Sequence, residues 1–181
     1  FAERLMERYR AAGLPAGRVP TPAEDGAQYP PPSFNLTSAL HHGAPSIVAQ
    51  PILGLSSGRV IAYEALSRFS PELPSYSPDI WFAMAHECGL GPMFEARAVD
   101  LAIRAGAERP KGTLLSVNVS PSVLSTRELH DVLPFDLSGL QLEVTEKEVV
   151  ADGDQFQMVL KALRDRGARV WGQNPAFHPS C

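Results

Sequence analysis

From residue 46 onwards, apolar runs with strand character alternate with longer segments of helical periodicity, and this rhythm constrains the fold more than any other feature. Strands are expected at 47–53, 59–64, 114–118, 140–146 and from 168 onwards. Helices are expected at 79–88, 91–108, 126–133 and 153–166. After an initial hairpin with a turn at 56–58, this order favours a parallel sheet covered by helices. The predicted fold class is therefore α/β, either an open sheet or a barrel.

The chain before residue 46 lacks this rhythm and divides into two segments. Residues 1–13 are expected to form a short amphipathic helix from an upstream region, because their apolar residues recur at helical spacing. Residues 14–45 are expected to form a proline-rich linker, since proline fixes φ and removes a backbone donor. The main domain is then expected over 46–170, followed by an aberrant tail at 171–181 without α/β periodicity.

Composition excludes several classes of protein. With 181 residues, of which 44% are hydrophobic and 20% charged, the chain suits one globular domain with a short attachment. A net charge of −4 argues against a protein that coats nucleic acid, and no apolar run approaches the ~18 residues of a membrane span. Two cysteines make no disulfide scaffold, so a reducing cytoplasm is the expected compartment. Because the chain begins with Phe1, it is expected to be part of a longer protein.

Three of the expected strands end in a residue with an oxygen ligand: Glu64, Asn118 and Glu146. Carboxylate and amide oxygens are the ligands that hard cations such as Mg²⁺, Mn²⁺ and Ca²⁺ prefer. Because the functional site of a β/α barrel lies at the carboxyl ends of its strands, these side chains can converge on one ion. The alternative is that polar residues end strands simply because strand ends face solvent. Glu143 is left out of the set, since alternation places it on the opposite face of its strand from Glu146.

A set of short motifs sharpens this hypothesis. Residues 64–69 have the sequence Glu-Ala-Leu-Ser-Arg-Phe, and Gln-Pro-Ile precedes them at 50–52. Residues 116–120 are Ser-Val-Asn-Val-Ser, residues 143–146 are Glu-Val-Thr-Glu, and a helix–strand segment follows at 163–170. In composition and order these motifs resemble the EAL domain family, the cyclic di-GMP phosphodiesterases. The resemblance covers roughly the first half of such a domain.

The resemblance implies a modified β/α barrel whose first strand is antiparallel, present here in part. It also implies hydrolysis of cyclic di-GMP to the linear dinucleotide, with two divalent ions, Mg²⁺ or Mn²⁺, that activate a water molecule. By the same resemblance, the metal ligands are Glu64, Asn118 and Glu146. Gln50 and Leu66 would line the nucleotide site, and Arg68 would contact a phosphate, for which a planar guanidinium is suited.

The chain departs from the family pattern after Val170. Where the family has two aspartates, which hold the second ion, this chain continues with Trp171 and Gly172. Two carboxylates balance only two of the four positive charges of two divalent ions, so at best one weakly bound ion and impaired hydrolysis are expected. The alternatives are an inactive module that binds cyclic di-GMP or a protein partner, and a gene remnant without function. The uncovered edge of a half barrel is also expected to promote self-association.

Overall fold

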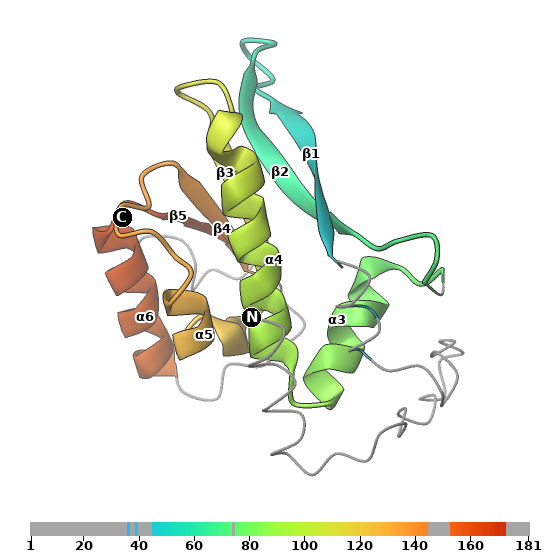
Figure 1. The fold of residues 1–181 in the computed structure, drawn as a ribbon. Helices are drawn as coiled ribbons and strands as arrows, with labels where there is room; N and C mark the ends of the chain where they lie inside the picture. Colours follow the sequence, from blue (N-terminus) through green and yellow to red (C-terminus); the bar gives the residue numbers. More distant parts are fainter. Residues whose placement is uncertain (1–35, 37–38, 40–44, 74, 145–152, 173–181) are drawn as a thin grey trace. The chain divides into compact units, whose positions relative to one another are not determined.

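The computed structural model describes residues 36, 39, 45–73, 75–144 and 153–172 (Figure 1). The helix predicted at 1–13, most of the linker predicted at 14–45 and the tail beyond residue 172 lie outside the described residues. Within the described part of the chain, no helix is both long enough and apolar enough to cross a membrane.

The chain forms two compact units, which we call the aromatic unit and the sheet unit. The aromatic unit comprises Phe1–Ser46 and Ser67–Phe94, and the sheet unit comprises Ile47–Leu66 and Glu95–Cys181. The elements along the chain are β1 (Ser46–Leu53), β2 (Val60–Arg68), α3 (Pro78–Glu87), α4 (Gly91–Ala105), η1 (Gly106–Glu108), β3 (Leu114–Val119), η2 (Pro121–Val123), α5 (Arg127–His130), β4 (Leu140–Val144), α6 (Gly153–Asp165) and β5 (Arg169–Trp171).

The aromatic unit is held by stacked rings. Helix α3 begins at a proline, whose fixed φ suits the first helical position. From this helix Trp81 is fully buried, and its ring stacks on that of Phe69 with centroids 5.0 Å apart. At the end of α3, burial and, to a smaller degree, the neighbouring Glu87 carboxylate raise the pKa of the Cys88 thiol. The thiol therefore stays protonated at neutral pH and is a poor nucleophile.

The sheet has the order β1-β2-β3-β4-β5, and the pairs β2–β3, β3–β4 and β4–β5 are parallel. Helices lie in the connections from β2 to β3 and from β4 to β5, as parallel crossovers require (Figure 1). Among the described strands the sheet stays open, with β1 and β5 at its edges. This arrangement confirms the predicted α/β class.

Strands β1 and β2 form the predicted hairpin. They are neighbours in the sheet and are joined by residues 54–59 alone, which is too short for a parallel crossover. The Gly54 N–H donates to the Arg59 carbonyl over 2.9 Å and closes the loop. Gly58 has φ +62°, a conformation that glycine adopts without the steric cost of a Cβ. The first strand is therefore antiparallel to the second.

Two expected boundaries were wrong. Strand β2 continues to Arg68, so Glu64 lies within the strand and not at its end. Pairing with β3 continues one residue beyond Glu64, with Ala65 beside Val117. The helix predicted at 126–133 is a single turn, α5. Pro134 follows this region, and a proline disfavours helical geometry in the residue before it.

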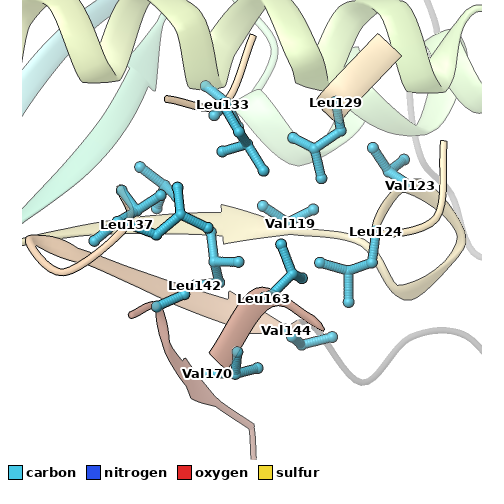
Figure 2. Packing of buried hydrophobic residues seen from close by; sticks show 14 of the residues in the cluster. Val119, Val123, Leu124, Leu129, Leu133, Leu137, Leu142, Val144, Leu163 and Val170 are labelled. Carbon is cyan, nitrogen blue, oxygen red and sulfur yellow. The ribbon is translucent and has the colours of Figure 1, made fainter. Parts of the chain in front are cut away.

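One face of the sheet forms the core of the sheet unit, and we call it the apolar face. Its central row consists of register neighbours, one from each parallel strand: Ala65, Val117, Leu142 and Val170. Each of the four is at most 9% exposed. Fully buried leucines from α5 and α6, Leu129, Leu160 and Leu163, belong to the same cluster. Figure 2 shows Leu163 of α6 pointing towards Val119, Leu142 and Val144 on the strands.

Candidate functional site

The opposite face of the sheet is rich in hydrogen-bonding and charged groups, and we call it the polar face. Because side chains alternate along a strand, residues two apart share a face. Register places Glu64 beside Ser116, Ser116 beside Gln141, Asn118 beside Glu143 and Glu143 beside Trp171. By these pairings and by alternation, the polar face comprises Glu64, Leu66, Ser116, Asn118, Gln141, Glu143, Arg169 and Trp171.

Glu64 and Asn118 are brought into direct contact. The Asn118 side-chain amide donates from Nδ2 to Glu64 Oε1 over 3.0 Å. The two residues lie 54 positions apart in the sequence, and the parallel pairing of β2 with β3 brings them together. This contact leaves Asn118 Oδ1 and Glu64 Oε2 as oxygen acceptors. Asn118 is exposed and Glu64 is half-buried, so a ligand in solution can reach the pair.

Glu143 is fixed by a second group of contacts on the same face. The hydroxyl of Ser116, which is fully buried, donates to Glu143 Oε1 over 2.5 Å. Gln141 Nε2 donates to the same Oε1 over 3.1 Å and to Ser116 Oγ over 3.2 Å. Ser116 and Gln141 thus share one carboxylate oxygen, Glu143 Oε1, as their common acceptor. A carboxylate held in this way has a defined orientation and keeps its second oxygen for another ligand.

The polar face changes the candidate ligand set. The structure brings together Glu64 and Asn118, two of the three predicted ligands, whereas Glu146 lies outside the described residues and remains a prediction. Glu143, which the sequence analysis left out, shares the face of Glu64 and Asn118. Alternation assigns Glu143 and Glu146 to opposite faces of their strand, but it does not say which of these faces also holds Asn118. The signal that could have found Glu143 is the strand register.

An amide completes the donor set on this face. In the described part of the chain, no three His, Cys, Asp or Glu side chains form a cluster able to hold a metal ion. A cation site on the polar face would therefore combine the carboxylates of Glu64 and Glu143 with the amide oxygen of Asn118. These are oxygen donors of the kind that hard divalent cations accept.

The predicted nucleotide-binding residues lie in both units. Gln50 is exposed on β1, and Leu66 is half-buried on the polar face of β2. Arg68 is the last residue of β2 and belongs to the aromatic unit. Its guanidinium is exposed and donates from Nη1 to the Ser67 carbonyl over 2.8 Å, and its own carbonyl accepts from Ser46 Oγ. Among the described residues the bond to Ser67 is the one hydrogen bond of the guanidinium, so most of its donors remain for a ligand.

The motifs of the polar face and the parallel sheet together match one known family. The EAL domain model matches residues 35–171. The chain belongs to the EAL domain family. Its predicted family and fold class are therefore confirmed.

Individual proteins are similar to this chain in sequence and in structure. The uncharacterized protein y4lL of Sinorhizobium fredii (strain NBRC 101917 / NGR234) is 31% identical over 145 residues, which is 75% of this EAL chain and 17% of the relative. The PaMucR phosphodiesterase, solved in complex with c-di-GMP, is 25% identical with a TM-score of 0.61. That match covers 75% of this chain and 60% of PaMucR.

BlrP1 of Klebsiella pneumoniae, solved with calcium and cyclic di-GMP, is 29% identical with a TM-score of 0.55. The match covers 70% of this chain and 34% of BlrP1. A manganese and cyclic di-GMP complex of BlrP1 matches with a TM-score of 0.53. This EAL chain thus spans less than two thirds of the length of each of these relatives.

Proposed function

We propose that this EAL chain acts in cyclic di-GMP signalling, with its polar face forming the cation-binding wall of the dinucleotide site. The observation that supports this most is the alignment of Glu64, Asn118 and Glu143 on three neighbouring parallel strands. PaMucR and BlrP1 are complexes with cyclic di-GMP, and BlrP1 also holds calcium or manganese. We therefore infer that the polar face of this chain binds cyclic di-GMP and a divalent cation.

The donors of the polar face fit one divalent cation in kind and in charge. Two carboxylates balance the two charges of one ion, and the Asn118 amide adds a neutral oxygen. A bound divalent cation supplies polarisation of a phosphoryl oxygen and a more acidic water. Ser116 and Gln141 keep the Glu143 carboxylate oriented through their bonds to Oε1. Mg²⁺ or Mn²⁺ is the expected ion, and Glu146 remains a further predicted ligand.

The nucleotide contacts are carried over from the sequence motifs. Leu66 offers apolar surface to a purine, and Gln50 offers an amide that both donates and accepts hydrogen bonds. Arg68 offers a planar guanidinium to a phosphate. These three roles are part of the proposal, and each is removed by one substitution: Gln50→Ala, Leu66→Ala or Arg68→Ala.

We expect this chain to bind cyclic di-GMP but to hydrolyse it only slowly. The register neighbour of Glu143 on β5 is Trp171, whose side chain is 57% exposed and offers no oxygen ligand. A second cation would need further carboxylates to balance its charge, and the described polar face holds only Glu64 and Glu143. We therefore propose cation-assisted binding of cyclic di-GMP as the activity of the chain, with the family's hydrolysis impaired.

Titration of the 181-residue chain with Mn²⁺, followed by the loss of the free-ion electron paramagnetic resonance signal, tests this proposal. One Mn²⁺ per chain is expected, and Glu64→Gln should weaken its affinity by about tenfold or more, because one of two charged ligands is lost. Glu108→Gln is the matched control, since it removes an exposed carboxylate of the same unit, away from the polar face. Equal effects of the two substitutions would contradict the assignment.

Calorimetry with cyclic di-GMP, in the presence of Mn²⁺, completes the test. Binding that weakens in Arg68→Ala is the expected outcome, together with little linear dinucleotide by chromatography. Rapid hydrolysis of cyclic di-GMP that is abolished by Glu64→Gln would refute the proposal that hydrolysis is impaired. The absence of any binding would refute the whole proposal and favour a remnant without function.

Self-association and location complete the proposal. Strand β5 pairs on one side, with β4, and in the described sheet its other edge is uncovered. An uncovered strand edge favours pairing with another chain, so we expect dimers or larger species in sedimentation velocity. A monodisperse monomer with cooperative melting would contradict this expectation. The cytoplasm is the expected compartment, in keeping with a free thiol at Cys88.

A further inference from the structure

Only two polar or charged side chains are buried in the described part of the chain, Ser116 and Glu95. Ser116 belongs to the polar face and orients Glu143. Glu95 lies on helix α4, is 5% exposed, and belongs to none of the motifs that identify the family. Because a buried carboxylate is unfavourable unless hydrogen-bonded, the identity of its donors indicates what the residue does.

Both carboxylate oxygens of Glu95 bind the same residue, Ser120. The Ser120 backbone N–H donates to Oε2 over 2.8 Å, and the Ser120 hydroxyl donates to Oε1 over 2.6 Å. Such short bonds to a charged acceptor are the stronger kind of protein hydrogen bond. Glu95 and Ser120 both belong to the sheet unit, 25 residues apart in the sequence.

Ser120 is the residue at which the chain leaves the sheet. Strand β3 ends at Val119, and Ser120 precedes the short helix η2 with extended backbone angles, φ −73° and ψ 144°. The Ser120 carbonyl accepts from the Val123 N–H over 3.0 Å, so the N–H, the hydroxyl and the carbonyl of Ser120 are all hydrogen-bonded. Asn118, the amide of the proposed cation site, lies two residues before this point.

From these contacts we infer that Glu95 is a positioning residue: its buried carboxylate fixes the carboxyl end of β3 and thereby holds Asn118 against Glu64. This inference rests on the proposed cation site and adds a residue from helix α4 to it. Without the two hydrogen bonds between Ser120 and Glu95, the end of β3 is free to fray. The Asn118 amide then loses its defined distance to Glu64. Residues that orient the ligands of a metal commonly change metal affinity by about 10–100-fold when replaced.

The test compares Mn²⁺ affinity among four variants of the full chain. Glu95→Gln should weaken Mn²⁺ binding by about tenfold or more. Ser120→Ala, which removes one of the two bonds, should weaken it less, and Ser120→Thr, which keeps the hydroxyl, should restore it. The matched structural control is Arg109→Ala, because Arg109 donates to the Gly106, Thr113 and Gly139 carbonyls near the other end of β3. It should lower stability and leave Mn²⁺ affinity unchanged.

Equal losses of affinity in Glu95→Gln and Arg109→Ala, or in Ser120→Ala and Ser120→Thr, would overturn the positioning role. A readout without any metal separates this inference from the proposed function. In metal-free samples, the side-chain amide signals of Asn118 in a nitrogen–proton correlation spectrum should shift in Glu95→Gln and Ser120→Ala, but not in Arg109→Ala. If the wild-type chain binds no Mn²⁺, the proposed function fails, and these signals alone decide the inference. Unmoved Asn118 signals would then refute it.

Discussion

The two faces of the sheet are built from the same strands and yet obey different rules. On the apolar face, register neighbours such as Val117 and Leu142 are almost fully buried and meet leucines from the helices. On the polar face, neighbours such as Asn118 and Glu143 keep some exposure and find their partners within the sheet. Residues of the two faces differ by a single position along each strand, because successive side chains point to opposite faces.

This contrast teaches where stability and chemistry reside in the sheet unit. Burial of apolar area stabilises the fold, and a side chain lost from that face leaves a cavity. The polar face contributes little burial, but it aligns carboxylate, amide and hydroxyl groups from three consecutive strands. Of the two buried polar residues described, Ser116 donates to Glu143, the register neighbour of Asn118, and Glu95 accepts from Ser120, two residues beyond Asn118. Substitutions on the two faces should therefore separate stability from ligand binding.

The largest effect is expected on the apolar face. Leu142→Ala should reduce the free energy of unfolding by about 2–5 kcal/mol, because Leu142 is fully buried and the substitution leaves a cavity. Urea denaturation followed by circular dichroism measures this change. Met158→Ala on α6 is the control, since Met158 is 65% exposed and should alter stability by about 0.5 kcal/mol or less. Similar effects at both positions would mean that the apolar face is not the core.

A smaller loss of stability is expected at the end of the sheet where β3 and β4 begin. Arg109→Ala removes donors to three backbone carbonyls, at distances of 2.9–3.1 Å. Hydrogen bonds from a charged group contribute about 1.5–3 kcal/mol, and the same denaturation experiment should show a loss of that order. Because Arg109 binds carbonyls at the start of β3, whereas Asn118 lies near its end, Mn²⁺ affinity should not change. A loss of affinity would show that the two ends of β3 are coupled.

On the polar face, Ser116→Ala should affect ligand binding more than stability. The substitution removes the donor to Glu143 Oε1, at a cost of about 1 kcal/mol in unfolding free energy. Mn²⁺ affinity should fall as the Glu143 carboxylate loses its orientation, by about tenfold. Titration by electron paramagnetic resonance, alongside urea denaturation, gives both numbers. A large loss of stability with unchanged affinity would place Ser116 with the core.

The smallest effect concerns pH. The Ser138 backbone N–H, and then its hydroxyl, donate to the Asp136 carboxylate and lower its pKa below the ordinary 3.8. A lowered pKa in the folded state means that this contribution to stability is present above the unfolded value and is lost as pH falls through the folded value. Asp136→Asn should therefore shift the urea midpoint slightly at pH 7 and by less at pH 2. Since Asp136 is fully exposed, a large shift at pH 7 would contradict this account.

Prediction from the sequence was most successful where local pattern and tertiary structure agree. The strands at 114–118 and 140–146 and the helix at 153–166 correspond to β3, β4 and α6 in the described residues. Their boundaries follow hydrophobic periodicity, which burial of the apolar face reinforces. The helix predicted at 91–108 is α4 followed by a 3-10 turn, η1, because the end of a helix often tightens. At β2 the predicted strand stopped too early, because pairing with β3 continues to Ala65 and the strand itself continues to Arg68.

The candidate site shows which residues could be predicted from sequence motifs and which depend on tertiary contacts. The order of the motifs identified the family, and Glu64 and Asn118 could be named from these motifs. This was possible because a cation's preference for oxygen ligands can be matched to residue types in the sequence alone. The place of Glu143 and the part of Glu95 could not be predicted. Glu143 depends on the register between β3 and β4, and Glu95 depends on the packing of a helix that lies 25 residues before Ser120.

The amino-acid sequence by itself determined the α/β class, the EAL family and two members of the proposed cation site. These follow from residue types and their spacing along the chain, which are local properties. Only the tertiary structure decided which carboxylate shares a face with Asn118 and which buried carboxylate fixes its strand end. Both are contacts between segments distant in sequence, and alternation along a single strand is blind to how one strand is aligned with the next.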